Sequence, residues 1–271
     1  MRTISRLAVA ALGSACLATT LLFAGCGGSS EPVGRPTATP TPTPTVSLSD
    51  LVLLMHLDEA AWTGTPGEVV DSSGLGANGK ALGGATTVAP GKFGRAGSFG
   101  PESGIQIVEN VNVQVTNQLT VAAWVFPKSE GNGNWRGIVA KRVDYTVKSA
   151  YTLFLDPGNH LCADINTEDD RFCITTTVGV DQWSHVALVY NGTVDPAARV
   201  LLYINGQLAG VGSESSTSIQ PFDSPLWVGC LPLSGPAQSL VGLVDEVAIW
   251  HRALGAQEVQ RLAAATAPLT H

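Results

Sequence analysis

Alternating hydrophobic and polar positions predict short β-strands over most of this chain. The clearest case runs from Trp183 to Leu208, where two sets of side chains alternate with the two-residue period of a strand. The dipeptides Asn191-Gly192 and Asn205-Gly206 follow the two apolar runs, and Asn-Gly supplies the positive backbone angles that tight hairpin turns need. This segment therefore predicts two antiparallel strands with a turn at each end.

Helical periodicity is largely absent before the C-terminus. The run from Gly255 to Ala264 places Val259, Leu262 and Ala263 on one side and predicts a short helix. Residues 48–266 contain no further low-complexity break, and their number is usual for one all-β domain. Residues 267–271 are expected to form a tail outside this domain.

The first residues predict export and attachment to a membrane. Arg2 and Arg6 precede an almost wholly apolar run, and Phe23-Ala24-Gly25 stands directly before Cys26. This arrangement is similar to a bacterial lipobox, which implies that residues 1–25 are a lipoprotein signal peptide and that Cys26 is diacylated. An ordinary secretory peptide with a chance cysteine, or an uncleaved membrane helix, is the alternative.

Residues 26–47 continue from the lipidated cysteine as a linker rich in proline and threonine. The alternating prolines from Pro36 to Pro44 favour the extended polyproline II form. About 20 residues at ~3.1 Å each would reach roughly 60 Å from a bilayer. We therefore expect an outward-facing domain in the cell envelope that meets the membrane only through its lipid anchor. In a diderm host the anchor would lie in the outer membrane.

The charge balance excludes one class of partner. The chain has 15 Lys and Arg against 22 Asp and Glu. Removal of Arg2 and Arg6 with the signal peptide leaves 13 basic and 22 acidic side chains, a formal charge of −9. Because no basic run occurs either, nucleic acid is not expected as a partner.

Cys162 and Cys173 flank a polar tip at residues 166–170, as the arms of a hairpin would. The alternation puts both cysteines on one face, opposite the apolar residues Leu161, Ala163, Ile165, Phe172 and Ile174. Exported proteins meet oxidising conditions, so a disulfide between the two strands is predicted. Two free thiols packed as small apolar groups are the alternative. Cys230 is then left over and is expected to be buried and unreactive.

A series of sequence blocks covers the whole segment beyond the linker. In chain order, the blocks are Leu51–Glu59, Asp71–Gly79, Gly91–Phe99, Leu119–Phe126, Gly137–Lys141, the hairpin described above and Gly242–Trp250. In content and order they resemble the LamG-like jelly-roll domain of the concanavalin A-like lectin/glucanase superfamily. The resemblance implies an all-β fold: a two-sheet antiparallel jelly-roll sandwich with a short C-terminal helix.

The same resemblance implies a structural calcium ion. In this superfamily the first and last strands are often neighbours and frequently share one. That arrangement would place Asp245 as a side-chain ligand, with further oxygens from Asp58, Asp71 and Asn78, and calcium prefers such oxygen ligands. An edge salt bridge for Asp245 and local turns at Asp71 and Asn78 are the alternative.

Two tryptophans in glycine-rich loops are candidates for contact with a sugar. Trp62 and Trp135 lie in such loops, and Arg136 follows the second. An aromatic ring on a loop can stack on the apolar face of a sugar while a nearby polar group binds its hydroxyls. Each ring can equally be a lid packed over the edge of the core.

The sequence shows no catalytic pattern. Family 16 glycoside hydrolases of this superfamily carry a Glu-x-Asp-x-(x)-Glu strand, which is missing here, and Asp245 and Glu246 are expected to point to opposite faces. The sequence therefore predicts a non-catalytic recognition module at the cell surface that binds an extracellular glycan. An envelope protein as partner, in adhesion or assembly, is one alternative; a diverged polysaccharide hydrolase or lyase is the other.

Overall fold

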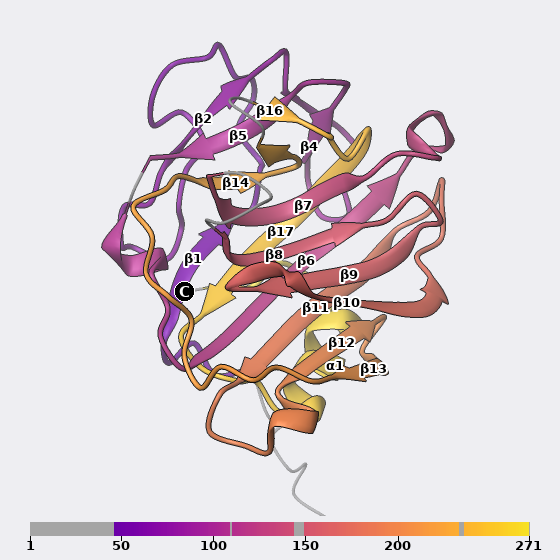
Figure 1. The fold of residues 1–271 in the computed structure, drawn as a ribbon. Helices are drawn as coiled ribbons and strands as arrows, with labels where there is room; N and C mark the ends of the chain where they lie inside the picture. Colours follow the sequence, from indigo (N-terminus) through magenta and orange to yellow (C-terminus); the bar gives the residue numbers. More distant parts are fainter. Residues whose placement is uncertain (1–45, 109, 144–148, 233–235, 271) are drawn as a thin grey trace, which may run out of the picture. The chain divides into compact units, whose positions relative to one another are not determined.

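The computed structural model describes residues 46–108, 110–143, 149–232 and 236–270. The predicted signal peptide, Cys26 and nearly all of the linker therefore lie outside the described residues. Two antiparallel sheets face each other, and a short helix lies against the outside of one of them (Figure 1). The predicted fold class, an antiparallel jelly-roll sandwich with a C-terminal helix, is confirmed.

The first sheet has the strand order β13-β12-β11-β6-β17-β4-β3, and β1 also pairs with β17. Its strands are β1 (Leu51–Met55), β3 (Thr86–Val88), β4 (Ala96–Phe99), β6 (Gln118–Pro127), β11 (Ser184–Asn191), β12 (Val200–Ile204), β13 (Gln207–Gly212) and β17 (Gly242–Trp250).

The second sheet has the order β10-β9-β8-β7-β14-β5-β2. Its strands are β2 (Gly79–Leu82), β5 (Gly104–Ile107), β7 (Arg136–Arg142), β8 (Ser149–Leu155), β9 (His160–Ile165), β10 (Thr167–Thr177) and β14 (Leu226–Val228). The remaining elements are β15 (Leu231–Pro232), β16 (Pro236–Ala237), the short 3-10 helices η1 (Val111–Val113), η2 (Ser129–Gly131) and η3 (Pro196–Ala198), and the helix α1 (Ala256–Ala264).

The two strands predicted from Trp183 to Leu208 and the turn at Asn205-Gly206 are confirmed, but Asn191-Gly192 does not form a tight turn, because the connection from β11 to β12 is longer and contains η3. Strands β11 and β12 pair in the register Leu188 with Leu202, and the alternate residues of β11 enter the core between the sheets. Asn205 and Gly206 follow β12 with φ angles of 50° and 77°. Two successive positive φ angles match the right-handed twist of the strands that the turn joins.

Apolar side chains form a core between the sheets and two further clusters outside it. The central core takes residues from both sheets, including Val121, Leu153 and Val186. A second cluster lies between the outer face of the first sheet and α1, and includes Trp250 and Leu262. A third cluster, on the outer face of the second sheet, holds aromatic and cysteine side chains. Both outer faces of this sandwich therefore carry buried groups.

The disulfide between Cys162 and Cys173 is present, as predicted. The two residues are direct partners in the β9–β10 register, and both belong to the cluster outside the second sheet. The hairpin turn is tighter than the sequence suggested, because β10 already begins at Thr167 after a left-handed Asn166. Cys230 is buried, as expected, and that it is unreactive stays a prediction.

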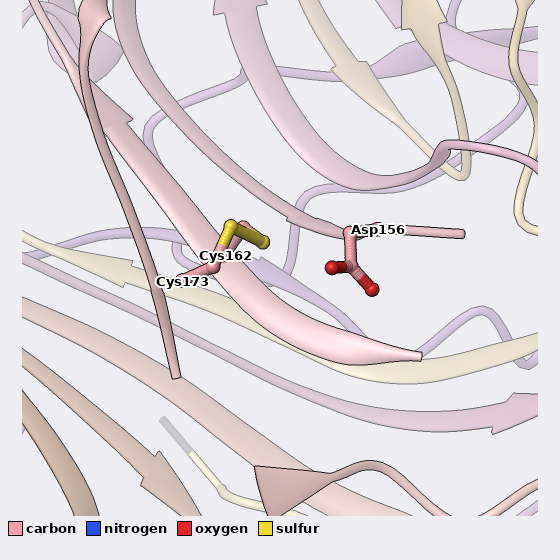
Figure 2. Close-up of side chains that lie close together, drawn as sticks. All are labelled: Asp156, Cys162 and Cys173. Carbon is pink, nitrogen blue, oxygen red and sulfur yellow. A yellow bond between two sulfur atoms is a disulfide. The ribbon is translucent and has the colours of Figure 1, made fainter. Parts of the chain in front are cut away.

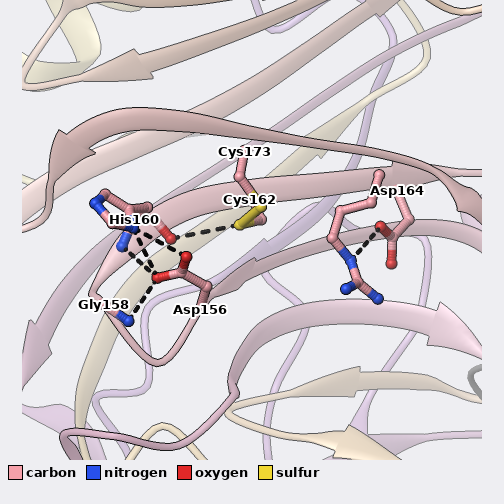
Figure 3. The surroundings of a disulfide bond; sticks show 7 residues. Asp156, Gly158, His160, Cys162, Asp164 and Cys173 are labelled. Atoms are coloured by element: carbon pink, nitrogen blue, oxygen red, sulfur yellow. Dashed lines mark hydrogen bonds and ion pairs between the residues drawn. A yellow bond between two sulfur atoms is a disulfide. The ribbon is translucent and has the colours of Figure 1, made fainter.

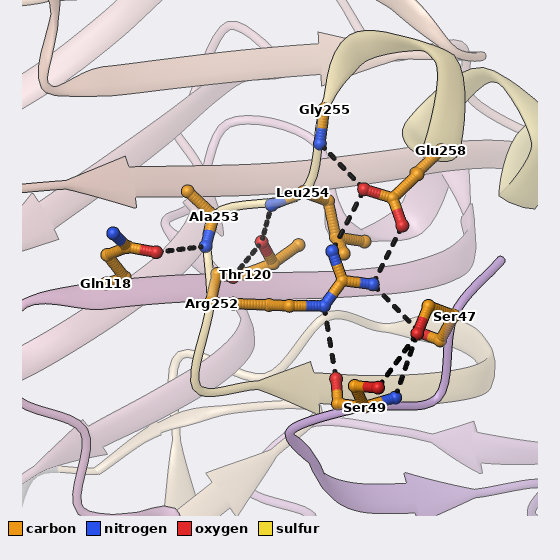
Figure 4. Close-up of polar contacts among 9 residues, drawn as sticks. All are labelled: Ser47, Ser49, Gln118, Thr120, Arg252, Ala253, Leu254, Gly255 and Glu258. Carbon is orange, nitrogen blue, oxygen red and sulfur yellow. Dashed lines mark hydrogen bonds and ion pairs between the residues drawn. The ribbon is translucent and has the colours of Figure 1, made fainter.

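Arg252 fastens the beginning of the domain to its end (Figure 4). Its guanidinium donates to the carbonyl oxygens of Ser47 and Ser49 at 2.9 and 3.1 Å, and to both carboxylate oxygens of Glu258 in α1 at 2.8 and 2.9 Å. Leu269 packs against the same outer cluster, together with Val46 and Leu48. The packed domain thus reaches beyond the predicted limit at residue 266.

No helix within the described ranges is long and apolar enough to cross a membrane.

Lys141 is a buried charge that the sequence did not reveal. Its register partners Tyr151 and Leu226 belong to the central core, so its side chain faces inward, and it is 0% exposed. The ammonium donates to the carbonyl oxygen of Ser224 at 2.7 Å, and burial lowers the pKa of Lys141 to about 8. A buried charge with neutral partners destabilises a fold.

We expect Lys141→Met to raise the free energy of unfolding at pH 7 by about 1–3 kcal/mol, because an apolar side chain of similar length removes the desolvation penalty. The advantage should shrink as pH rises from about 8 toward 10.5, where the folded wild-type chain loses its proton before the unfolded chain does. Urea unfolding at several pH values measures this. Lys80→Met, at a half-buried position, is the matched control, and an advantage of Lys141→Met that does not vary with pH would contradict the explanation.

Candidate functional site

One end of the sandwich carries a cleft of about 730 Å³. Four chain segments meet there: the β4–β5 loop, the β6–β7 loop, the β8–β9 turn and the residues just before β17. The lining consists of Ser98, Phe99, Gly100, Pro101, Glu102, Lys128, Glu130, Gly133, Asn134, Trp135, Pro157, Gln238, Ser239 and Val241. Binding clefts for small ligands have volumes of about 300–1,000 Å³, so this cleft is large enough to hold several sugar units.

The loops of the cleft are held in strained backbone conformations. Glu102, Gln238 and Val241 have φ angles of 55°, 44° and 48°, in the left-handed region that glycine favours. Such a conformation is a genuine outlier for a β-branched residue such as Val241. Strained residues persist only where the surrounding structure fixes them, and they concentrate at functional sites.

Two hydrogen bonds fix these strained residues to the strands. The backbone N–H of Lys128 donates to the carbonyl oxygen of Val241 at 2.9 Å, and the N–H of Gly137 donates to that of Gln238 at 2.9 Å. Lys128 follows β6 directly and Gly137 lies in β7. The rigid ends of two strands therefore set the shape of this side of the cleft.

Trp135 is the aromatic side chain that the predicted site and the cleft share. It is half-buried, and its ring lies 5.7 Å from the ring of Phe154. The guanidinium carbon of Arg171 stands 4.6 Å from the centre of the Trp135 ring. A neighbouring ring and a cation therefore hold the indole in one orientation at the edge of the cleft, with Arg171 covering part of one face.

Arg136 lies behind the lining of the cleft and not in it, contrary to its predicted role as a ligand contact. It is 0% exposed, because its position in β7 directs the side chain toward Lys128 and Gly131. Its Nη1 donates to the carbonyl oxygen of Lys128 at 3.5 Å, and burial lowers its pKa while nearby Asp156 opposes that shift. Arg136 thus supports the β6–β7 loop from behind.

Trp62, the other predicted sugar contact, is a lid over the core. It is 8% exposed, belongs to the central cluster, and its Nε1 donates to Glu59 at 3.0 Å. A ring with its faces buried in this way offers no stacking surface. The prediction for Trp62 is therefore corrected: the glycine-rich loop folds back over the sandwich.

Asp71 and Asn78, two of the four predicted calcium ligands, organise their own loop. Each carboxylate oxygen of Asp71 accepts two hydrogen bonds: one takes the N–H groups of Leu54 and Ser73, the other the Ser73 hydroxyl and the Ala77 N–H. The Asn78 side chain accepts from the N–H of Asp71 at 2.8 Å. A carboxylate has about four lone-pair sites, so Asp71 has none left for a metal.

Asp58 and Asp245, the other two predicted calcium ligands, both accept hydrogen bonds from the loop between β3 and β4. Asp58 accepts from the N–H of Arg95, and Asp245 accepts from that of Phe93 at 3.0 Å. Burial raises the pKa of Asp245 to about 8, although three backbone N–H groups oppose this shift. A bound cation would stabilise the ionised form of such a buried carboxylate. Calcium binding therefore stays a prediction, and it now rests on Asp58 and Asp245.

Glu246 shows why the alternation rule failed at this point. The sequence places Asp245 and Glu246 on opposite faces, yet the residues on either side of them, Val244 and Val247, both enter the central core, so the two-residue period is broken between them. The register of β17 with β6 shifts between Asp245 and Ala248, and Glu246 has a φ of 52°. This β-bulge turns Glu246 toward His56, whose Nδ1 lies 2.9 Å from its carboxylate, and that contact raises the pKa of His56.

Among the described residues, one group of at least three His, Cys, Asp or Glu side chains brings its ligand atoms within 4.8 Å of one another. It consists of Asp156, Cys162 and Cys173 (Figure 2). Asp58, Asp71 and Asp245 do not form such a group.

The chain matches the model of one known protein family over more than half of its length. The model for the concanavalin A-like lectin/glucanases superfamily covers residues 99–260. The chain belongs to this superfamily. A search of curated proteins gave no match.

Solved structures of this superfamily's fold are similar to the chain at low sequence identity. Domain 4 of AbnA, a GH43 extracellular arabinanase from Geobacillus stearothermophilus in complex with arabinotriose, has 22% identity and a TM-score of 0.59, over 79% of this chain and 98% of that domain. The binding domain of Paraclostridial Mosquitocidal Protein 1 has 17% identity and a TM-score of 0.59. A Trypanosoma rangeli sialidase has 17% identity and a TM-score of 0.57.

The alignment with the mosquitocidal domain includes 79% of this chain and 52% of the other. The alignment with the sialidase includes 84% of this chain and 35% of the other. This chain thus spans about half of the first and about a third of the second. At these identities the likeness shows the fold. Lectin-like binding domains and enzymes both occur among these structures, and the fold is compatible with a binding module.

Sequence reasoning missed most of the cleft of this superfamily member. Glu102, Lys128 and Gln238 come from loops that are far apart in the sequence and have no hydrophobic period. Only the segment from Gly131 to Trp135 carried a signal, because its Gly and Asn residues predict a loop and its aromatic residue is unusual there.

We expect Asp71→Asn to lower the free energy of unfolding by about 2–3 kcal/mol, because an amide nitrogen in place of one oxygen would face two buried donors. Urea unfolding should give the same loss with added calcium and with a chelator. Asp223→Asn, at an exposed carboxylate, is the control and should change stability by less than about 0.5 kcal/mol. A loss seen only with calcium would instead assign Asp71 to a metal site.

Proposed function

We propose that this chain is a lipid-anchored, non-catalytic recognition module of the cell envelope that binds a neutral polysaccharide in the cleft at the end of the sandwich. The observation that carries the proposal is the cleft itself: a fixed indole, Trp135, stands beside amide, hydroxyl and carboxylate groups in a volume of about 730 Å³. Sugars offer these groups an apolar face and a ring of hydroxyls.

The charges of the cleft favour a neutral chain. Glu102 and Glu130 carry negative charge, and Lys128 is the one basic residue in the lining. The predicted mature protein has a formal charge of −9 as well. An anionic polysaccharide would therefore be repelled, whereas carboxylates and amides accept and donate hydrogen bonds to neutral hydroxyls.

Two similar structures support a glycan as the partner. The arabinanase domain was solved with arabinotriose, a neutral sugar. A botulinum neurotoxin type C structure, with 15% identity and a TM-score of 0.52, is described with cell entry that depends on two ganglioside molecules. This fold is thus used for glycan binding in other proteins, which supports the same use here.

The position of the cleft suits a tethered receptor. Strand β17 begins at Gly242, beside the cleft residue Val241, and ends at Trp250, which pairs with Leu51 where the chain enters the domain. Nine residues of strand span roughly 25–30 Å. A linker that joins before Leu51 would therefore hold the domain by the end opposite its cleft and leave the cleft open to the outside.

We expect a glycan array probed with the protein to give binding to neutral polysaccharides, and Trp135→Ala to weaken that binding at least about tenfold, or ~1.4 kcal/mol. Trp183→Ala is the matched control, because Trp183 is a half-buried tryptophan outside the cleft. Isothermal titration with the best polysaccharide gives both affinities.

Three outcomes would count against this function. Silence across neutral, acidic and amino sugars, together with a protein captured reproducibly by cross-linking in intact cells, would favour the protein-binding alternative. Equal losses in the two tryptophan variants would remove the cleft as the site. Cleavage of a bound polysaccharide that Glu102→Gln or Glu130→Gln abolishes would make the protein a hydrolase or lyase.

We expect Cys26→Ser to move the protein from the membrane fraction to the soluble exported fraction and to abolish incorporation of labelled fatty acid, because Cys26 is the proposed lipid attachment site. Cys16→Ser, a second cysteine of the N-terminal region, should leave both readouts unchanged. Membrane retention of Cys26→Ser equal to that of the wild type would overturn the anchor.

A further inference from the structure

Four side chains with metal-binding chemistry share the outer face of the β8–β9–β10 meander. His160 and Cys162 are two apart on β9 and therefore project from the same face. Cys173 of β10 is the direct register partner of Cys162. Asp156 comes from the turn before β9, and Figure 2 shows its carboxylate turned toward the two sulfurs.

Three of these four side chains bring their ligand atoms close together, and the fourth, His160, contacts one of the three. One oxygen of Asp156 and the sulfurs of Cys162 and Cys173 lie within 4.8 Å of one another. The Nδ1 of His160 lies 2.9 and 3.1 Å from the two oxygens of Asp156 (Figure 3). The side chains of His160 and Asp156 are 34% and 20% exposed, so the group is open to solvent on one side.

We propose that Asp156, His160, Cys162 and Cys173 form a zinc site when the disulfide is reduced, and that the disulfide is the oxidised, metal-free state of the same residues. Zinc in structural sites takes four nitrogen, oxygen and sulfur ligands in a tetrahedron. Bond lengths of about 2.0–2.3 Å place such ligand atoms roughly 3.3–3.8 Å apart. One oxygen of Asp156 and the two sulfurs already lie within 4.8 Å of one another, whereas the sulfurs must separate after reduction and the His160 ring, whose nitrogens lie outside this group, must turn toward them to complete the tetrahedron.

The redox step defines when the metal binds. A thiol reductant reduces the disulfide: two RSH become RSSR, and the S–S bond becomes two Cys–SH groups. Zn²⁺ then replaces the two thiol protons, which go to solvent, and thiolates are strong zinc ligands. In the oxidised state the sulfurs are shared in a covalent bond, which leaves only Asp156 and His160 for a metal.

The local charge suits this exchange. Two thiolates and one carboxylate bring a formal charge of −3, which Zn²⁺ reduces to −1. Arg171 lies two residues before Cys173 on the same face of β10, with its guanidinium over Trp135 and Phe154. A positive charge on the same strand favours the thiolate form of the cysteines, although the Asp164 carboxylate, 3.6 Å from the Nε of Arg171, offsets part of that charge.

The test uses the full chain in detergent with Cys16→Ser, Cys26→Ser and Cys230→Ala, which leaves Cys162 and Cys173 as its two cysteines. Cobalt(II) is the probe, because thiolate ligands give it a strong charge-transfer absorption. We expect this band after reduction with a phosphine, no band in the oxidised protein, and loss of the band when Zn²⁺ is added. Zn²⁺ should also raise the Tm of the reduced protein and not that of the oxidised protein.

Single substitutions separate the site from general thiol binding. Cys173→Ser should reduce the band to about half, in proportion to thiolate number. Asp156→Asn and His160→Gln should keep the band but weaken cobalt affinity, whereas Asp223→Asn, at an exposed carboxylate elsewhere, should not. Equal cobalt affinity in the Asp156→Asn, His160→Gln and Asp223→Asn variants would overturn the four-ligand site.

Two further results would overturn the proposal. One is the absence of a cobalt band in reduced protein that keeps its near-ultraviolet circular dichroism. The other is unfolding of the reduced protein even with excess Zn²⁺, because a metal bound at this hairpin should replace the constraint of the disulfide. Glycan binding by the cleft is measured separately, so neither result bears on the proposed function.

Discussion

Strand β17 is hydrogen-bonded along both edges, and the rest of the domain depends on this pairing. One edge pairs with β6 from Gly242 to Trp250. The other edge is shared by two short strands, β4 at the start of β17 and β1 at its end. Between the two partners the ladder is interrupted, and the bulge at Asp245 and Glu246 lies at this interruption. The carboxylate of Asp245 accepts backbone N–H groups from the β3–β4 loop there, so a side chain takes over part of the role of a missing strand.

The same strand separates the two ends of the domain. Its last residue is held beside the chain entry, where Arg252 joins the first described residues to α1. Its first residue follows Val241 directly, so the loops that precede and surround it form the cleft. Binding residues are commonly carried by loops on a rigid scaffold. Here one strand fixes both the place of attachment and the place of binding, which lie at opposite ends.

The sequence predicted those parts of the structure that depend on interactions between residues close together in the chain. The pairing of β11 with β12, the turn at Asn205-Gly206, the C-terminal helix and the Cys162–Cys173 pairing follow from alternation, Asn-Gly preference and helical spacing, each of which acts within about ten residues. The bulge at Glu246 has no such signal, because it depends on where β4 ends and β1 begins. The burial of Trp62, and of Arg136 behind the cleft, likewise depends on contacts across the sandwich. The cleft was found only through Trp135, since its other polar residues come from loops that the sequence does not relate to one another.

The strain in the cleft is itself part of the argument for binding. Non-glycine residues in the left-handed region cost about 1–3 kcal/mol each, and three of them, Glu102, Gln238 and Val241, line this cleft. Glycine would adopt these angles without that cost. The backbone hydrogen bonds from Lys128 and Gly137 hold two of the three in place before any ligand arrives. Loops that are already ordered in the free protein lose less conformational entropy when a ligand binds. The strained but fixed backbone therefore gives a preorganised binding surface.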